Sequence, residues 1–564
     1  MHGFDLLLIH PPSVYDFRDR DDILFAYLSN SDSVHVSPIF EMPPVGMIGI
    51  EQHATSLGLL AQFFNVASRM LRDPGFSVEA FFERTPARWV GFDLHWLAHA
   101  HGGLALAELY KRIHPGAKTL FGGISATLFH DELVRYPQVD YVVRGYDTLV
   151  PLERLYAAKD DPARLAEVPN LTWKLDGEVR VNEMTHVPRS YGVGVDWSNV
   201  FAADGRKRTP YNLVIPQAGC EYSCTWCGGS RYTFSKYMGL SKGPARVHKP
   251  VEELTRELGS IARSPTRGHT ITMVDFWHEY EDLFSAASNV FLDDSIQCVH
   301  YSLHRLPKLE KGARMARGIK AVFELSPDSH DPEIARAAGR GKYTMAEMEA
   351  FIDGLLGEVY SFEIYFLIGL PLQTTDSVLE MVDYCGHLLA KYKGKNVNPF
   401  VCPMLPFLDP ASEISDNADR FGYTISHRTL EDHRRALTSL NWKDRLNYET
   451  KWMTRDDLVS VSYEAVRRLT LLKQQHRKLP EVFARSIVSR IDKTRALLGE
   501  IDAFQALPEG PERSARQREI AGKVLAYNRD QLKEVRSQQR PVDAGFTKQQ
   551  WFDTDAAFDR VMGG

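Results

Sequence analysis

The chain has 564 residues, of which 44% are hydrophobic and 25% charged, and its formal net charge is −6 at pH 7. This length predicts several folded domains, and the ordinary composition excludes a disordered, collagen-like or low-complexity chain. The acidic charge argues against general attraction to nucleic acid, and no apolar run approaches the roughly 20 residues of a membrane-spanning helix. Six cysteines are too few for a disulfide framework at this length. We therefore expect a soluble, cytoplasmic protein with no nucleic-acid or membrane partner, whose first residues form a strand rather than a signal peptide.

Residues 1–165 are expected to form an α/β domain. Short apolar runs predict strands, and helical periodicity appears between them, for example in residues 103–113. The expected strands cover residues 5–9, 76–82, 89–95, 119–123 and 141–145. This alternation predicts a doubly wound, Rossmann-like parallel sheet, which binds ligands beyond the carboxyl ends of its strands. Residues 166–210 would form a hairpin around Asp176 and Gly177, and then a linker.

A second alternating stretch, residues 211–424, predicts a partial (β/α)6 barrel with its chemistry at the carboxyl ends of the strands. The expected strands cover residues 213–216, 270–276, 296–303, 321–325, 363–368 and 396–404, with helices at 250–262, 332–338 and 345–355. Residues 425–564 lack strand patterns and predict a helical C-terminal domain. We expect a break in these helices at Pro480 and a polar tail after Pro508.

Three of the cysteines form a cluster, Cys220, Cys224 and Cys227, directly after the first barrel strand. This C-x-x-x-C-x-x-C spacing would arise by chance in roughly one such chain in a thousand. Structural zinc takes four ligands, and no second pair follows, whereas three thiolates suit a [4Fe–4S] cluster whose fourth iron stays open. The remaining cysteines, Cys298, Cys385 and Cys402, are expected in the core.

The stretch Gly219-Cys220-Glu221-Tyr222-Ser223-Cys224-Thr225-Trp226-Cys227 resembles the signature of the radical S-adenosylmethionine (SAM) superfamily, C-x-x-x-C-x-aromatic-C. The resemblance implies that the three cysteines are the metal ligands and catalytic centre, and that SAM chelates the open iron. Its SAM-binding segments correspond to strand ends of this barrel, although the usual glycines are missing beside Asp275. The alternative is that these are ordinary rim residues. The implied SAM contacts are Trp226, Gly228, Asp275, Glu324, Ser326, Arg336, Arg340 and Gly369.

The first domain resembles the cobalamin-binding domain that is fused to many radical SAM enzymes. Residues 43–46, 122–127 and 139–145 carry this resemblance. The D-x-H-x-x-G motif is absent after the first strand, so we expect no loop histidine on cobalt; His95, with His99 and His101, would line the pocket. The implied cobalamin contacts are Pro12, Ser13, Asp93, His95, Gly122, Gly123, Ser125, Thr127, Gly145 and Tyr146.

Together these resemblances imply a cobalamin-dependent radical SAM methyltransferase with a [4Fe–4S] cluster, S-adenosyl-L-methionine and cobalamin. It would move a methyl group from SAM through methylcobalamin to an unactivated or aromatic carbon of a specialised metabolite. The likeness is greatest to an archaeal-like subgroup. The resemblance also raises one specific candidate reaction, the C-methylation of a carrier-bound pyrrole-2-carboxyl group in aminocoumarin antibiotic biosynthesis. An external reductant of flavodoxin or ferredoxin type is also implied.

Two other functional classes remain open from the sequence. A cobalamin and radical SAM enzyme could catalyse a non-methylating rearrangement, cyclisation or oxidation, and a sensor or scaffold could retain the cofactor folds. The intact cysteine set argues against the second of these. For the substrate wall, the C-terminal residues Trp442, Tyr448, Trp452 and Arg455 combine aromatic and cationic groups, although the same residues suit helix packing.

Overall fold

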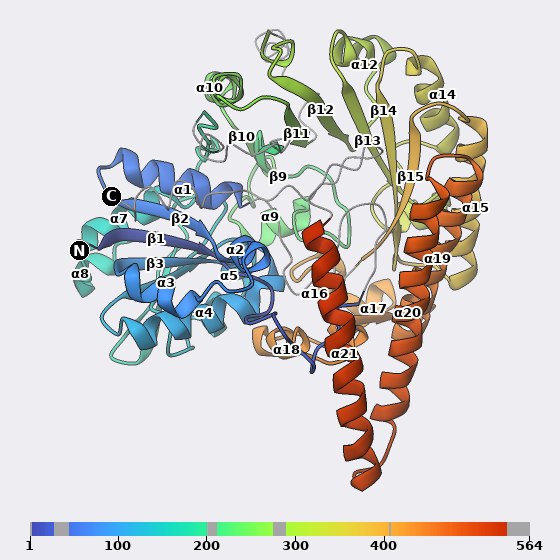
Figure 1. The fold of residues 1–564 in the computed structure, drawn as a ribbon. Coiled ribbons are helices and arrows are strands. Elements are labelled where there is room, and N and C mark those ends of the chain that lie inside the picture. Colours follow the sequence, from blue (N-terminus) through green and yellow to red (C-terminus); the bar gives the residue numbers. More distant parts are fainter. Residues whose placement is uncertain are drawn as a thin grey trace.

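The computed structural model describes residues 3–26, 44–198, 200, 211–274, 289–404 and 408–537. Two sheets, the first mostly and the second wholly parallel, lie side by side with their helices, and the long C-terminal helices pack against the second sheet's domain (Figure 1). This confirms the expected α/β class, with a doubly wound first domain, a partial barrel and C-terminal helices. In the part of the chain that is described, no helix combines the length and apolar character needed to cross a membrane.

The first sheet has seven strands in the order β2-β1-β3-β4-β5-β6-β7, and the first five in this order run parallel. Its strands are β1 (Phe4–His10), β2 (Ala61–Asn65), β3 (Ala87–Asp93), β4 (Lys118–Gly122), β5 (Tyr141–Val143), β6 (Leu171–Leu175) and β7 (Glu178–Val181). The last two form the expected hairpin and extend the sheet antiparallel to β5. Strand order reverses at β1, so the crevice beyond the ends of β1 and β3 is where such sheets bind ligands.

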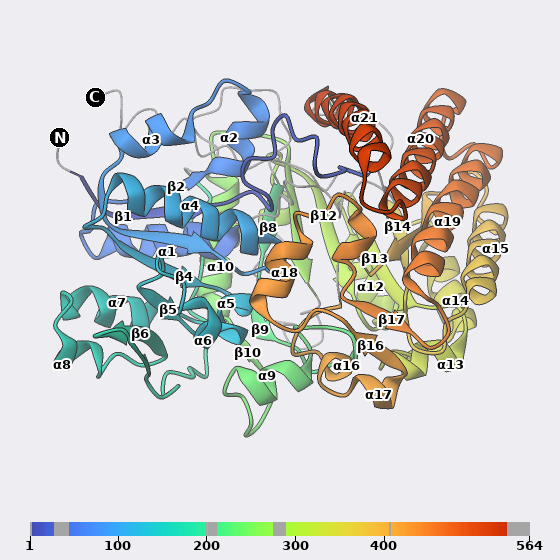
Figure 2. The same ribbon diagram turned by 90° about the horizontal axis from the view of Figure 1, so that it is seen from below.

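Helices cover both faces of this sheet (Figures 1 and 2). They are α1 (Val45–Ser56), α2 (Val66–Arg72), α3 (Val78–Arg84), η1 (Leu97–His99), α4 (Ala100–Ile113), α5 (Ile124–Leu128), α6 (His130–Leu133), α7 (Leu149–Ala158) and α8 (Pro162–Leu165).

One expected strand of the first domain is wrong: most of residues 76–82 lies in helix α3, and β2 is the second strand instead. Ser77 caps α3 by accepting a hydrogen bond from the Ala80 N–H at 3.1 Å. Phe81 of α3 stacks on Phe64 of β2 with 4.3 Å between the ring centroids. A short apolar run suits either a strand or a buried helix, and here the cap and the packing favour the helix.

The second sheet has six parallel strands in the order β15-β14-β13-β12-β11-β8. Its strands are β8 (Tyr211–Val214), β11 (His269–Val274), β12 (Ile296–Leu303), β13 (Ala321–Asp328), β14 (Ser361–Ile368) and β15 (Val397–Pro403). The accompanying elements are β9 (Gln217–Gly219), α9 (Arg231–Tyr237), β10 (Arg246–His248), α10 (Val251–Ala262), α12 (Leu309–Ala316), α13 (Pro332–Ala337), α14 (Met345–Leu355) and α15 (Thr375–Lys391). The expected barrel strands are thus all present.

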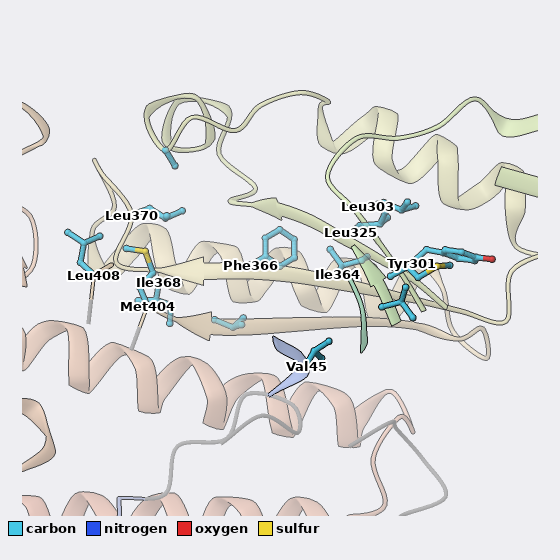
Figure 3. Close-up of a cluster of buried hydrophobic side chains, with 14 of the residues drawn as sticks. Val45, Tyr301, Leu303, Leu325, Ile364, Phe366, Ile368, Leu370, Met404 and Leu408 are labelled. Carbon is cyan, nitrogen blue, oxygen red and sulfur yellow. The ribbon is translucent and has the colours of Figure 1, made fainter. Parts of the chain in front are cut away.

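The two faces of this second sheet differ in polarity. Leu325 of β13 and Phe366 of β14 belong to the large apolar core, together with neighbours from β12 (Figure 3). Side chains alternate along a strand, so Glu324 and Glu363 point to the opposite face, as does His300 of β12. All three of these polar residues are buried. The barrel therefore has a polar interior and an apolar outer face beneath its helices.

The C-terminal region is largely helical. Its elements are α16 (Glu413–Asp416), α17 (Ala418–Phe421), β16 (Tyr423–Ile425), α18 (Leu430–Ala436), η2 (Trp442–Arg445), β17 (Tyr448–Thr450), α19 (Arg455–Gln475), α20 (Glu481–Gln505) and α21 (Pro511–Ser537). The break at Pro480 is confirmed, because this proline is the N-cap residue of α20. The expected polar tail after Pro508 is wrong up to residue 537, since α21 buries Ile520 and Val524 and carries Glu519 ion pairs along its exposed side.

Helix α21 also reaches the first domain, lying between α20 and α2 (Figure 2). Its Asn528 side chain accepts a hydrogen bond from the Phe25 N–H at 2.9 Å and donates to the Ile23 carbonyl oxygen at 2.7 Å. The segment after β1 is therefore tied to the other end of the chain. The strands β6 and β7 belong to the first sheet although they follow residue 165. The expected domain boundaries at residues 165, 210 and 424 stay predictions.

Candidate active site at the junction of the two sheets

The cysteine loop lies between β9 and α9, after the first barrel strand. Two backbone hydrogen bonds hold it: the Thr225 N–H donates to the Ala338 carbonyl oxygen at 3.0 Å, and the Ile414 N–H donates to the Thr225 carbonyl oxygen at 2.9 Å. Gly339 has a φ of +79°, and a Cβ there would lie 2.0 Å from the Ser223 carbonyl oxygen. Glycine is therefore required where the turn after α13 approaches the loop.

The spacing of the three thiols bears on what they can bind. Two thiolates on one zinc ion lie at most about 4.6 Å apart, because each Zn–S bond is about 2.3 Å. Among the described residues, the ligand triplets in which all atoms lie within 4.8 Å of one another consist of histidines and carboxylates, and none includes a cysteine. All three cysteines are free thiols. The loop thus fits a cluster with one cysteine per iron better than a single ion.

The surroundings of the thiols keep them protonated unless a cation is bound. Burial raises the pKa of Cys224 to about 11 and that of Cys227 well above its usual value. Backbone N–H groups point at two of the sulfurs: Tyr222 lies 3.4 Å from Cys220 Sγ, and Gly229 lies 3.3 Å from Cys227 Sγ. Buried thiolates need positive charge to offset their lost hydration, which bound iron would provide.

Asp409 supports the loop next to the last cysteine. Its Oδ2 accepts a hydrogen bond from the Gly228 N–H at 2.8 Å. Burial raises the pKa of Asp409 to about 6, although this hydrogen bond opposes the shift. The two residues are far apart in the chain, and no local pattern marks Asp409. Sequence reasoning therefore missed it.

Several of the expected SAM contacts make other interactions in the protein. The Arg340 Nε donates to Asp328 Oδ2 at 2.9 Å, and both side chains are almost fully buried. Glu324 Oε1 lies 3.4 Å from His300 Nδ1 in the barrel interior. Asp275 lies outside the described residues. None of these observations tests SAM binding, so these contacts stay predictions.

The other expected SAM contacts surround the cysteine loop or end a barrel strand. Trp226 and Ser326 are partly buried, and Arg336 is exposed. Gly369 follows β14 with a φ of +101°, and its carbonyl oxygen accepts a hydrogen bond from the Tyr423 hydroxyl at 2.5 Å. Contact of these residues with SAM stays a prediction.

The expected cobalamin contacts converge on the carboxyl edge of the first sheet. The Ser125 hydroxyl donates to the His95 carbonyl oxygen at 3.0 Å, which joins the ends of β3 and β4. The Gly145 N–H donates to Thr127 Oγ1 at 2.9 Å, which joins the ends of β4 and β5. Four neighbouring strands, β1, β3, β4 and β5, end at or just before the expected contacts Pro12 and Ser13, Asp93 and His95, Gly122 and Gly123, and Gly145 and Tyr146. The structure thus brings the set together, while contact with cobalamin stays a prediction.

A buried polar group at this edge was not predicted. His10 ends β1, and its Nδ1 lies 3.0 Å from Asp93 Oδ2 at the end of β3. The rings of His10 and His99 meet edge to face, with 4.8 Å between their centroids. Burial would raise the pKa of Asp93, but the hydrogen bond to His10 and the nearby imidazoles hold it well below its usual range. The strand order that makes β1 and β3 neighbours could have suggested this contact.

The carboxyl edge of the first sheet faces the helix that follows the cysteine loop. Tyr146, after β5, and Phe234 of α9 have ring centroids 5.9 Å apart. Phe234 belongs to a buried apolar cluster, against which Ile124 of α5 and Tyr146 pack. The Tyr146 hydroxyl also donates to the Pro188 carbonyl oxygen at 2.5 Å. The two predicted cofactor regions therefore meet at one apolar junction.

The expected substrate residues lie in the C-terminal region, some of them in its core. Trp442 is 0% exposed and meets Tyr463 at 6.0 Å between ring centroids. The Tyr448 hydroxyl donates to the Met404 carbonyl oxygen at 3.2 Å. Trp452 and Arg455 are partly exposed. Such packing was the alternative that the sequence left open, and contact of any of these residues with a substrate stays a prediction.

Comparisons with known proteins agree with this geometry. Residues 42–153 match the family described as the B12 binding domain. The uncharacterized methyltransferase PH0819 of Pyrococcus horikoshii is 27% identical over 161 residues, which are 27% of this chain and 32% of that protein. The chain therefore matches about a third of the length of this relative.

Among solved structures, the chain is similar to the radical S-adenosylmethionine methyltransferase TsrM from Kitasatospora setae. The structure of TsrM with cobalamin and a [4Fe-4S] cluster bound has a TM-score of 0.55 and 13% identity, covering 94% of this chain and 100% of TsrM. The structure with tryptophan substrate and the SAM analog aza-SAM bound has a TM-score of 0.50 and 14% identity, covering 74% and 76%. Over nearly its whole length the chain therefore shares the fold of this methyltransferase, and it contains a segment that matches the B12 binding domain family.

Proposed function

We propose that the protein is a cobalamin-dependent radical SAM methyltransferase that transfers a methyl group from SAM to a carbon atom of a small molecule. The observation that carries this proposal is the junction at which Tyr146, on the ligand-binding edge of the first sheet, meets Phe234 beside the cysteine loop. The B12 binding domain match and the fold shared with TsrM support the same cofactors: a [4Fe–4S] cluster, SAM and cobalamin.

The residues of this chain fit those groups. The sulfurs of Cys220, Cys224 and Cys227 are not among the ligand triplets within 4.8 Å of one another, which suits one cysteine on each of three irons of a cluster and would leave one iron open. Gly123 and Gly145 both have positive φ, and a Cβ at Gly123 would lie 2.5 Å from His95 Cα. Glycine therefore lets the ends of β3 and β4 pack closely at the edge where cobalamin is expected. When bound, the cluster and SAM would supply a radical, and cobalamin would carry the methyl group.

The junction would also exclude water. The apolar cluster around Phe234 is buried, and a water-poor cavity protects reactive species and strengthens polar interactions within it. By holding two cofactor regions in contact, the chain supplies placement, which converts encounters between reactants into steps within one complex.

As the finer part of the proposal, the methyl acceptor is an aromatic or unactivated carbon of a specialised metabolite, with a carrier-bound pyrrole-2-carboxyl group as the specific candidate. Residues 93–103, 122–127 and 144–147 resemble an archaeal-like subgroup of cobalamin and radical SAM proteins. The pyrrole candidate is supported by the overall likeness of the chain to the aminocoumarin methyltransferases. An external flavodoxin- or ferredoxin-type protein would supply electrons.

The decisive experiment measures iron, cobalt and reaction products of anaerobically reconstituted protein. The comparison variant is Cys220→Ala, Cys224→Ala, Cys227→Ala. We expect about four irons per wild-type chain and none on the cysteine loop of the variant, with about one cobalt in both. With a reductant and an accepted substrate, the wild type should form S-adenosylhomocysteine.

The possible outcomes separate the alternatives. Four irons without cobalt would exclude methyl transfer through cobalamin. Both metals, with 5'-deoxyadenosine formed but no S-adenosylhomocysteine, would instead indicate a rearrangement, cyclisation or oxidation. A wild type without iron after reconstitution would contradict the radical SAM assignment itself.

A further inference from the structure

A second group of buried polar side chains lies in the barrel interior, away from the cysteine loop. His300, Glu324 and Glu363 come from the neighbouring strands β12, β13 and β14. Glu324 and Glu363 are paired in register, so their side chains project side by side from the polar face of the sheet. The three residues are 2%, 6% and 6% exposed. Two carboxylates so deeply buried lose most of their hydration, which a bound cation would offset.

The three residues of this group lie close enough together to share one cation. One ligand atom from each residue lies within 4.8 Å of the other two. The separation between His300 Nδ1 and Glu324 Oε1 is 3.4 Å, long for a charge-assisted hydrogen bond of about 2.7–2.9 Å. It is close to the roughly 3.4 Å between neighbouring ligands of a tetrahedral ion with bonds of about 2.1 Å.

Two neighbouring side chains complete such a site. The Tyr365 hydroxyl donates to Glu363 Oε2 at 2.7 Å, and this kind of second interaction orients a ligating carboxylate and leaves its other oxygen for the metal. Thr272 of β11 is paired in register with His300 and therefore shares its face of the sheet. The Thr272 residue is 5% exposed, and its hydroxyl has no hydrogen-bond partner among the described residues. A water on the ion, or the ion itself, would satisfy this hydroxyl.

We propose that His300, Glu324 and Glu363 bind one divalent first-row transition-metal cation inside the barrel, in addition to the iron held by the cysteines. One imidazole and two carboxylates form a hard to borderline ligand set, which suits Mn²⁺ and also accepts Zn²⁺, whereas thiolates select softer metals. None of its ligands lies on the cysteine loop or on the first sheet, but Glu324 is also one of the implied SAM contacts. The ion would therefore lie beside the SAM expected in the proposed enzyme.

The test uses the full chain with Cys220→Ala, Cys224→Ala, Cys227→Ala, so that neither iron nor zinc on the cysteine loop contributes. After chelator treatment, Mn²⁺ is titrated while free Mn²⁺ is followed by electron paramagnetic resonance. We expect about one Mn²⁺ per chain, and at least a 100-fold loss of affinity on adding Glu363→Gln. Glu349→Gln is the matched control, since this glutamate pairs with Lys391 outside the barrel and should change nothing.

Circular dichroism checks that each variant folds. If Glu363→Gln does not fold, Tyr365→Phe preserves every ligand and should weaken Mn²⁺ binding about 10-fold, because Glu363 loses the hydrogen bond that orients its carboxylate. Absence of Mn²⁺ and Zn²⁺ binding to the cysteine-free chain would overturn the proposal. Unchanged Mn²⁺ affinity in both Glu363→Gln and Tyr365→Phe would also overturn the proposal. The ion would then lie elsewhere, for example at the buried group of His10, Asp93 and His99.

Discussion

Asp409 shows how a single residue couples the cysteine loop to the far side of the barrel. Its carboxylate accepts the Gly228 N–H one residue beyond Cys227, and its side chain fills the space that a Cβ at position 228 would need. Because burial raises the pKa of Asp409 to about 6, the carboxyl group holds a proton in the folded protein at pH values where the unfolded chain has lost it. The loop is therefore expected to respond to pH.

The sign of this effect follows from proton binding. The folded state binds more protons than the unfolded state between about pH 4 and pH 6, so the free energy of unfolding falls as the pH rises through this window. The difference in pKa corresponds to about 3 kcal/mol. In iron-free protein, Asp409→Asn should flatten this part of the profile in urea unfolding measured from pH 4 to 7. The exposed Asp21→Asn variant should keep the wild-type slope, and an unchanged slope in Asp409→Asn would contradict the assignment.

At the scale of elements, helix α21 holds the segment that follows β1 in place through hydrogen bonds from one side chain. Asn528 makes three hydrogen bonds to the backbone of this segment, with Phe25, Ile23 and Arg20. The segment also contacts the C-terminal region, since the Leu24 N–H donates to the Leu440 carbonyl oxygen at 3.1 Å. A buried amide with both of its ends satisfied fixes backbone that has no sheet partner of its own.

Removing the Asn528 side chain should increase the local opening of residues 20–26 more than that of the rest of the protein. Asn528→Ala leaves buried backbone groups without partners, so we expect a loss of about 1–3 kcal/mol in stability. Hydrogen exchange at residues 20–26 should become at least 10-fold faster. Asp530→Ala, which changes an exposed residue of the same helix, is the control and should protect this segment as the wild type does. Equal exchange in both variants would show that the other contacts suffice.

At the scale of the whole molecule, the apolar cluster around Phe234 joins the two α/β domains. It draws side chains from α9 and β10 of the barrel domain, and Ile124, Tyr146 and Leu149 of the first domain pack against it. The cluster lies between the cysteine loop and the ligand-binding edge of the first sheet. Cofactor placement in the proposed enzyme should therefore depend on it.

Phe234→Ala should weaken the binding of cobalamin more than the binding of the iron–sulfur cluster. Phe234 is 4% exposed, and loss of a buried phenylalanine costs about 3–5 kcal/mol. We expect the variant to keep most of its iron but to lose cobalt several-fold faster on gel filtration, because the facing edge is no longer supported. Phe483→Ala removes a ring that is 44% exposed and should lose neither metal. Parallel loss of iron and cobalt would show that the cluster supports the whole fold instead.

Local patterns were the most reliable guide to this fold. The helix at residues 345–355 and the strand at 296–303 match α14 and β12 in both bounds, and the break at Pro480 is present. Residues 76–82 failed as a strand because a run of that length does not distinguish a buried strand from a buried helix. The helix α21 was missed because its stability depends on packing against α20, and its sequence is highly polar.

The sequence by itself determined the cysteine loop and the glycine-rich strand ends, because these depend on spacing within a few residues and on the backbone freedom of glycine. The tertiary structure alone decided which of these ends meet. His10 and Asp93 touch because β1 and β3 are neighbours in the sheet, and Glu324 and Glu363 are adjacent because β13 and β14 pair in register. Phe234 meets Tyr146 across two domains. Such contacts come from long-range strand order and domain packing, which no local pattern encodes.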